Sequence, residues 1–514
     1  MTPTPADLLD ILTRHVDLGH AQRDACFLRQ VRLALSGAGA PLPQAASHAV
    51  STLAALASFY RYTRNEDISL PDLRRIRAEA VLDLAGPGAD VLIVHDVSQL
   101  DYSTHNSKED RRLIGDHGGK GYEYVSCAAI DPRAGSFLGI LHDTLVHADG
   151  PDDRDVMDYN YEPLFARFSC SEKKRLRENH RHQMAVHIRG LAPLLAGRNA
   201  IHVGDREFDD LFLFHGSEKV QAKYVIRTQG NRNVQVPQYV WLPKEALAPK
   251  QAGHACPDGW VYANLRRLVD AVPLQPYKSL PLDAKGRVAY GSAVARVAHL
   301  STGACRVRLY RQAKRNKRYF RVPEAIELNL VVIRETEPPA GVPPLGWTLF
   351  TNLPVDTPED LAWVGHVYEL RWGIEEFHRL LKSGYDIEAE RLDNAEKIAK
   401  SLVLQTLAAM AMVNLKREVG LPPEGRLSEP DYRRVKAAVR ELNNPTIPLA
   451  LRLFALVVQL GGWLGRRRDP IGPTVFMRGL RQVLTMLDAL PRYGPLLDEV
   501  RSNPDVVRRL FSVE

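Results

Sequence analysis

Four polar residues of one segment have a spacing that could bring them together at a reactive site: Tyr368, Arg371, Glu375 and Lys382. On an ideal helix, which turns by about 100° per residue, these side chains fall within an arc of about 60°. The opposite side carries the apolar residues of the segment, which are Leu370, Ile374, Phe377, Leu380 and Leu381. One side is therefore expected to pack in a core while the other presents an acid, two cations and a phenol. The alternative is a solvated face with intrahelical charge pairs.

Two aspartates follow short apolar runs that predict buried strands. Residues 90–94 (DVLIV) lead to Asp96, and residues 200–204 (AIHVG) lead to Asp205. Carboxylates at strand ends, together with Glu375 from a helix, would supply the oxygen ligands that a hard divalent cation prefers. Two such ions can activate an attacking oxygen and stabilise the leaving oxygen of a phosphodiester. A single aspartate after a strand is otherwise an ordinary cap or turn residue.

The positive charge of the chain is concentrated in one segment. The formal net charge is +7 over 514 residues, and residues 306–321 hold eight basic residues and no acid. Removing those eight charges from +7 leaves the rest of the chain at −1. This basic arm is either a solvated loop or a DNA-binding arm, because aromatic residues lie among its cations. Its central candidates for phosphate contacts are Lys314, Arg315, Lys317 and Arg318.

Composition excludes several classes of protein. Hydrophobic residues make up 45% and charged residues 25% of the chain, which is ordinary for a globular protein and excludes disorder and fibrous repeats. The five cysteines are scattered and form no C-x-x-C pair, so they favour a reducing compartment and make a thiolate zinc site unexpected. The first residues lack the basic region of a signal peptide. Residues 447–465 are apolar but interrupted by Arg452 and Gln459, so a buried helix is expected there, not a membrane span.

The pattern along the chain predicts a succession of structural types. Residues 1–75 have helical periodicity, and residues 124–131 and 135–146 are predicted to pair as a hairpin of strands. A helix is expected over 183–196. Residues 225–352 alternate polar and apolar residues between Pro and Gly, which predicts a mostly β module. Helical periodicity returns at 358 and continues toward the end of the chain.

These motifs together resemble a known family. The pattern Tyr368-x2-Arg371-x3-Glu375-x6-Lys382 is similar to the Y-R-E-K motif of DDE transposases of the insertion-sequence-four family, to which the transposon-five transposase belongs. The segments VLIVHDVSQLDYSTH and VGDREFD resemble the first and second aspartate segments of that family. PLGWTLFTNLPV, YRYTRN at 60–65 and GGWLGRRRDPIG at 461–472 resemble further regions, in the order of the family.

The resemblance implies an α/β fold built on an RNase H-like catalytic core. The implied organisation is a helical DNA-binding domain over 1–75, the core in two parts over 76–224 and 353–420, a β-rich insertion domain over 225–352, and a helical dimerisation region over 421–514. In that core Asp96, Asp205 and Glu375 would be the catalytic residues and would bind two Mg²⁺ ions, with Mn²⁺ able to substitute.

The resemblance also implies DNA contacts. Tyr368, Arg371 and Lys382 would hold phosphates near the cleaved end, as would Arg227, and Trp347 would stack on a base flipped from the transposon end. Charged forks and indole rings suit those tasks. Without the resemblance, Trp347 is a core aromatic residue of a sheet. Residues 172–182 depart from the family pattern between the aspartates, so no DNA contact is assigned there.

Two other readings of the sequence are rejected. Residues 115–121 (GDHGGKG) lack the spacing and the hydroxyl residue of a phosphate-binding loop, so no nucleotide cofactor is expected. His180, His182 and His187 lack an H-E-x-x-H motif or a cysteine partner in the sequence, so a basic helix face is expected instead of a zinc site.

The expected function is that of a Mg-dependent DNA transposase, a nuclease and strand transferase that moves an insertion sequence by cut and paste, through a hairpin intermediate by family resemblance. Its partners would be double-stranded DNA, as terminal inverted repeats and target, and a second copy of the chain in a homodimer. A cytoplasmic, nucleoid-associated location and no membrane contact are expected. The helix over 474–490 could pair protomers or pack on its own core. The alternative function is a non-catalytic descendant that binds transposon ends and dimerises; the intact carboxylates argue against it because they repel DNA.

Overall fold

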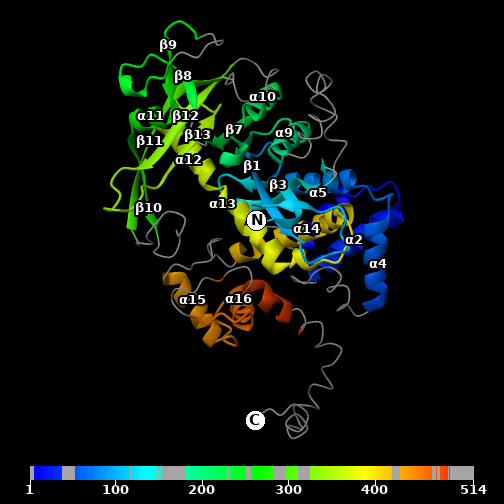
Figure 1. The fold of residues 1–514 in the computed structure, drawn as a ribbon. Helices are drawn as coiled ribbons and strands as arrows, with labels where there is room; N and C mark the ends of the chain where they lie inside the picture. Colours follow the sequence, from blue (N-terminus) through cyan, green and yellow to red (C-terminus); the bar gives the residue numbers. More distant parts are fainter. Residues whose placement is uncertain are drawn as a thin grey trace. The chain divides into compact units, whose positions relative to one another are not determined.

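The computed structural model describes residues 5–36, 52–115, 118–148, 150–151, 180–228, 232–249, 256–282, 296–310, 325–418, 429–465, 471, 475–483 and 486. The chain forms two compact units (Figure 1). The helical unit comprises Met1–Ala80, Thr104–Glu109 and Glu376–Glu514, and the sheet unit comprises Val81–Ser103 and Asp110–Glu375. The five predicted segments stay a prediction, because these units are divided at other places in the chain.

The helical unit brings both ends of the chain into one core. Its principal helices are α1 (Pro5–His15), α2 (Ala21–Ser36), α4 (Thr52–Arg64), the first part of α5 (Leu70–Ala85), α14 (Ala395–Glu418), α15 (Glu429–Arg440) and α16 (Leu449–Leu460). Tyr62 of α4 is fully buried, and its hydroxyl donates to the carbonyl of Lys400 in α14 at 3.2 Å. Arg77 of α5 is also fully buried and donates to Thr406 Oγ1 at 3.0 Å. The predicted N-terminal helices therefore pack on helices from the other end of the chain.

The last described helical segment, residues 475–483, crosses α16 at close range. A Cβ atom added at Gly479 would lie 1.6 Å from the carbonyl oxygen of Val457, so only glycine permits this crossing. Phe476 packs on Phe454 with ring centres 5.8 Å apart, and Leu480 and Val483 are buried. The described half of the helix predicted over 474–490 thus turns its apolar face into its own unit.

The sheet unit is built on a mixed sheet of 13 strands in the described part of the chain. Its strand order is β5-β4-β3-β1-β6-β7-β13-β12-β11-β8-β9, with β2 beside β3 and β10 beside β11. The strands are β1 (Val91–Asp101), β2 (Arg112–Ile114), β3 (Gly119–Asp131), β4 (Ser136–His147), β5 (Gly150–Pro151), β6 (Ala200–Gly204), β7 (Lys223–Arg227), β8 (Asn233–Pro237), β9 (Trp260–Asn264), β10 (Gln275–Leu282), β11 (Arg296–Tyr310), β12 (Ala325–Glu335) and β13 (Gly346–Thr351).

The centre of the sheet is parallel and its flanks are antiparallel. β6 pairs in parallel with β1 and β7, as is common for short, buried strands that are mostly apolar. The two predicted buried strands and the hairpin of β3 and β4 are confirmed. The predicted β-rich module is not set apart as a sheet of its own, because β13 pairs with β7 and continues the same sheet. The overall class is α/β with a large mixed sheet.

Helices cover the sheet and complete its core. The sheet unit contains η1 (Arg206–Phe208), α9 (His180–Leu191), α10 (Leu211–Lys219), η2 (Lys244–Ala246), α11 (Leu265–Ala271), α12 (Pro358–Glu369) and the start of α13 (Trp372–Arg379). α9 is the helix predicted over 183–196, and it begins and ends earlier. Phe214 of α10 packs on Tyr224 and Phe350 of the sheet, with ring centres 5.2 and 6.1 Å apart. These contacts fix the strands whose ends carry the candidate site.

Within the described ranges, no helix has both the length and the apolar character needed to cross a membrane. The apolar run at 447–465 forms α16, a helix of 12 residues that ends at Gly461.

Candidate active site

The two predicted aspartates lie at neighbouring strands. Val94 of β1 is in register with Val203 of β6, so Asp96 and Asp205 lie toward the same ends of two parallel strands. Asp205 caps η1, because its Oδ1 accepts a hydrogen bond of 2.8 Å from the Glu207 amide. The parallel pairing therefore brings together two carboxylates that are more than 100 residues apart in the chain.

Arg371 connects the strand carboxylate to the helix carboxylate. Its Nη2 donates to Glu375 Oε1 at 2.6 Å, and its Nη1 lies 3.9 Å from Asp96 Oδ1. The Arg371 side chain is only 10% exposed, against 16% for Asp96 and 31% for Glu375. Asp96 and Glu375 thus flank a single guanidinium group in a site partly shielded from water.

Negative charge accumulates at this site. Burial, together with the charges of Glu207 and Asp96, raises the pKa of the Asp205 carboxyl above its usual value, against the opposing effect of Arg371. Burial lowers the pKa of Arg371, but the neighbouring Tyr368, Asp96 and Glu375 raise it overall. Carboxylates that repel one another and share one cation are a donor set that fits a hard divalent ion.

An aromatic pair lies beside Arg371. Tyr368 and Trp347 are 2% and 7% exposed, and their ring centres lie 6.1 Å apart at an interplanar angle of 58°. Arg227, at the end of β7, is in register with Leu349 of β13. Burial raises the pKa of the Tyr368 hydroxyl, while the charges of Arg371 and Arg227 oppose that rise. Tyr368 is therefore the shared electrostatic neighbour of Arg371, Arg227 and Asp205.

The prediction of a single regular helix around Glu375 is wrong in one respect. α12 ends at Glu369 and α13 begins at Trp372, and the joint contains successive i to i+3 hydrogen bonds, from Arg371 to Tyr368 and from Ile374 to Arg371. Tyr368 and Arg371 lie at this joint and are both buried, so they do not form the solvated face that was the alternative. The expected apolar side is confirmed, since Ile374 and Phe377 are fully buried.

The other residues predicted to contact DNA belong to the helical unit or lie outside the described residues. Lys382 belongs to the helical unit, in the π-helical turn η5 (Leu380–Gly384), where its Nζ lies 3.4 Å from Glu388 Oε1. Lys314, Arg315, Lys317 and Arg318 lie outside the described residues. The described start of the basic arm is the end of β11, where the side chain of Arg308 lies 4.0 Å from Glu327.

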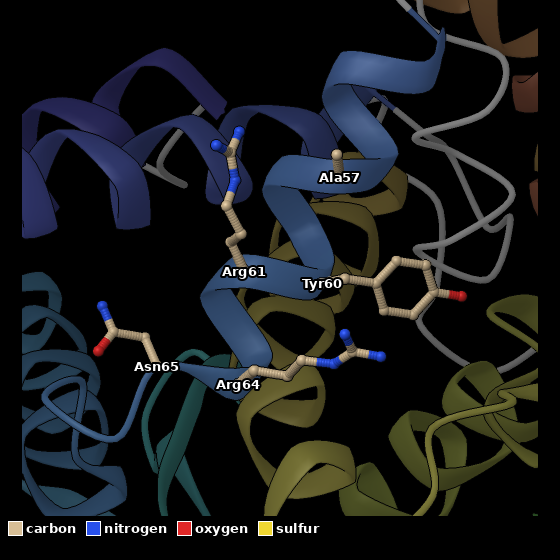
Figure 2. Close-up of a pocket in the computed structure, with 5 residues that line it drawn as sticks. All are labelled: Ala57, Tyr60, Arg61, Arg64 and Asn65. Carbon is tan, nitrogen blue, oxygen red and sulfur yellow. The ribbon is translucent and has the colours of Figure 1, made fainter.

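A basic pocket on α4 was not selected from the sequence. It has a volume of about 620 Å³ and is lined by Ala57, Tyr60, Arg61, Arg64 and Asn65 (Figure 2). Arg61 and Arg64 are exposed, and the Arg64 guanidinium carbon lies 5.6 Å from the centre of the Tyr60 ring. The signal was present in the helical spacing of the segment YRYTR, which places cations and a phenol along one helix.

Part of the chain is similar to a known family of domains. Residues 176–411 match the model of the transposase DDE domain. The match includes Asp205, Arg371 and Glu375 and begins after Asp96. It supports a DDE transposase, which is a nuclease and strand transferase acting on DNA, and DDE transposases generally use divalent metal ions.

Proposed function

We propose that the chain is a cut-and-paste DNA transposase of the insertion-sequence-four family, with an RNase H-like core and with Asp96, Asp205 and Glu375 as its acidic triad. The observation that carries the proposal is the Arg371 guanidinium, which is 2.6 Å from Glu375 and 3.9 Å from Asp96 while its charge also acts on Asp205. This grouping of carboxylates around one cation is supported by the transposase DDE domain match.

The carboxylates of Asp96, Asp205 and Glu375 would hold two magnesium ions. When bound, these ions supply Lewis-acid chemistry at the attacking and leaving oxygens of a phosphodiester. The raised pKa of Asp205 fits this role, because the carboxylate becomes easier to ionise when a cation offsets its neighbours. Without the ions, the positive charge of Arg371 offsets the negative charges of Asp96 and Glu375.

The cationic residues would hold the DNA. Arg371 and Arg227 would contact phosphate oxygens beside the triad, because a guanidinium can bind them with two parallel hydrogen bonds. Tyr368 would add a hydroxyl donor, and Lys382 a further cation. Arg61 and Arg64 of α4 suit phosphate contacts along a DNA backbone, and the basic arm at Lys314, Arg315, Lys317 and Arg318 would add more.

Later steps would follow the family. The freed 3′ oxygen would attack the opposite strand to give a DNA hairpin, and a homodimer would hold the paired transposon ends before joining them to target DNA. Association with the nucleoid would follow from that substrate.

Cleavage of the element's own terminal sequences in Mg²⁺ tests the proposal. Wild type should cut the DNA, and so should the control Glu376→Gln, because Glu376 lies off the predicted site. Glu375→Gln should cut at least about 10³-fold more slowly, because it removes a carboxylate of the proposed triad. Equal cleavage by both variants would remove Glu375 from the triad. DNA binding without cleavage by wild type would instead favour a descendant that only binds transposon ends.

A further inference from the structure

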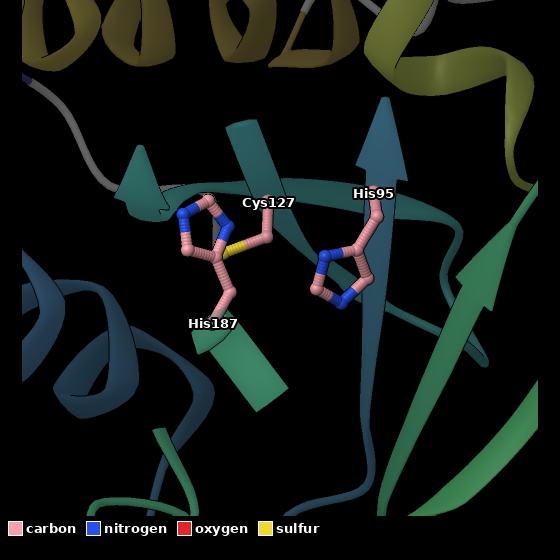
Figure 3. A group of neighbouring side chains, drawn as sticks. All are labelled: His95, Cys127 and His187. Atoms are coloured by element: carbon pink, nitrogen blue, oxygen red, sulfur yellow. The ribbon is translucent and has the colours of Figure 1, made fainter. Parts of the chain in front are cut away.

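A second group of chemically active side chains is buried in the sheet unit. His95 of β1, Cys127 of β3 and His187 of α9 converge so that one ligand atom from each lies within 4.8 Å of the others. All three side chains are fully buried. Figure 3 shows the Cys127 side chain between the two imidazole rings.

This His/Cys cluster faces away from the acidic site. His95 is in register with Cys127 across the β1–β3 pair, so the two side chains share one face of the sheet. Asp96 follows His95 in the same strand and therefore points to the other face. α9 covers the His95 face and supplies His187. The cluster is thus distinct from the proposed triad.

The donor set selects a class of ion. Thiolate and imidazole are the ligands that zinc prefers, whereas magnesium prefers oxygen ligands. We propose that His95, Cys127 and His187 bind one Zn²⁺ ion that ties β1 and β3 to α9.

Hydrogen bonds behind the cluster orient both rings. His95 Nε2 lies 2.9 Å from Nδ1 of His202, a buried residue of β6, and His95 Nδ1 has no hydrogen-bond partner in the part of the chain that the structure describes. The hydroxyl of Thr144 lies 2.9 Å from Nε2 of His187. These contacts direct Nδ1 of each ring to the metal, as second-layer partners do in zinc sites.

Zinc binds a neutral imidazole and a thiolate, so one ligand of the set must lose a proton when the ion binds. The Cys127 thiol, which donates to the carbonyl of His142 at 3.2 Å, would release its proton to solvent on binding the ion.

The dimensions require a small closure. Ligand atoms around tetrahedral zinc lie about 3.3–3.8 Å apart, so the widest separation of 4.8 Å must shorten by about 1 Å. The three residues would supply three of the four positions of a tetrahedral zinc ion. His142 lies beside His187, with ring centres 4.5 Å apart, and is not among the residues whose ligand atoms converge.

Metal analysis of the full-length protein tests the site. After reconstitution with Zn²⁺ and removal of loose metal, wild type should retain about one zinc per chain. Cys127→Ser should lose most of it. Cys305→Ser is the matched control, because Cys305 is a buried strand cysteine outside the cluster; it should retain the ion. Zinc in Cys127→Ser equal to that in wild type would overturn the proposal.

A second measurement needs no variant. Co²⁺ bound to wild type should give a thiolate-to-cobalt charge-transfer band that zinc displaces, and absence of that band would also overturn the proposal. Asp96→Asn should lose DNA cleavage while keeping its zinc. This separates the zinc site from the proposed function, because either can fail while the other stands.

Discussion

The Arg371 guanidinium donates to Glu375 Oε1 at 2.6 Å across one turn of chain, at the joint between two helices. The same group lies 3.9 Å from Asp96. Arg371 therefore balances two carboxylates from separate elements, which is a role that a divalent cation could share.

Arg371→Gln tests whether a divalent cation can take over the charge balance that Arg371 provides. Loss of the charged partner should lower the free energy of unfolding by about 1–3 kcal/mol without divalent ions. Mg²⁺ should then raise the thermal midpoint of the variant more than that of wild type, because the carboxylates lack their internal cation. Arg379→Gln, an exposed change at the end of α13, is the control. An equal Mg²⁺ effect in wild type and Arg371→Gln would contradict the shared role.

Trp347 can be tested for its proposed contact with a flipped base. Trp347→Phe keeps a ring and leaves a smaller cavity than an alanine would, so it should cost less stability than a Trp→Ala change, which costs about 3–5 kcal/mol. Trp347→Leu keeps apolar packing on Tyr368 but removes the stacking surface. The loss of one base stack should weaken binding of the transposon end by about 1–3 kcal/mol, so cleavage at limiting DNA should fall roughly 5- to 150-fold. Denaturant unfolding and cleavage rates measure the two effects. Equal cleavage by the Phe and Leu variants would leave Trp347 as a core residue only.

Glu335 and Arg296 form a buried pair in the β-rich part of the sheet. Two hydrogen bonds of 2.8 Å join them, and the Glu335 side chain is fully buried. The hydrogen bond from Arg296, aided by the Leu345 amide and opposed by burial, lowers the pKa of Glu335. Its stabilisation is therefore present above the unfolded pKa of about 4.3 and is lost as the pH falls through the lower folded value.

Glu335→Gln should lower stability by about 1.5–3 kcal/mol at neutral pH, because it removes hydrogen bonds to a charged partner that is only partly buried. The difference from wild type should shrink in acid. Glu337→Gln, at an exposed position two residues away, should have little effect at any pH. Unfolding free energies measured from pH 7 to pH 3 check the trend, and a constant difference across that range would refute it.

The α4 pocket gives a prediction for DNA affinity. Neutralising Arg61 and Arg64 together should weaken DNA binding and reduce the slope of log affinity against log salt by up to about 2. Arg75→Gln is the control, because Arg75 is already paired with Glu79 at 3.1 Å. DNA affinity measured at several salt concentrations tests this prediction. An unchanged slope would show that Arg61 and Arg64 make no contact with DNA phosphates.

The basic arm is predicted from sequence alone. Changing Arg315, Lys317 and Arg318 to Gln should weaken binding for any DNA sequence and flatten the salt dependence. The same titration measures this effect. If the slope stays at the wild-type value, the arm is a solvated loop.

Hydrophobic periodicity in the sequence predicted much of the fold. The short, mostly apolar runs at 90–94 and 200–204 lie in β1 and β6 or at their ends, as their length and β-branched residues predicted. Helical spacing likewise predicted helices on both sides of the sheet segments, and α1, α2, α4, α14, α15 and α16 are such helices. It did not indicate that β13 would pair with β7 and join the β-rich segment to the core sheet. Strand pairing over such distances depends on contacts that no local pattern contains.

The sequence by itself determined the types of the candidate site residues and the order in which they occur, because spacing and residue chemistry are local properties. Only the tertiary structure decided which residues meet. Arg371 is buried at the joint between α12 and α13, whereas its spacing in the sequence also allowed a solvated face. The histidine at position 187 had no cysteine partner in its own segment, yet strand register and the packing of α9 bring Cys127 and His95 to it. Close contact between distant segments is a product of packing, and spacing along the chain does not contain it.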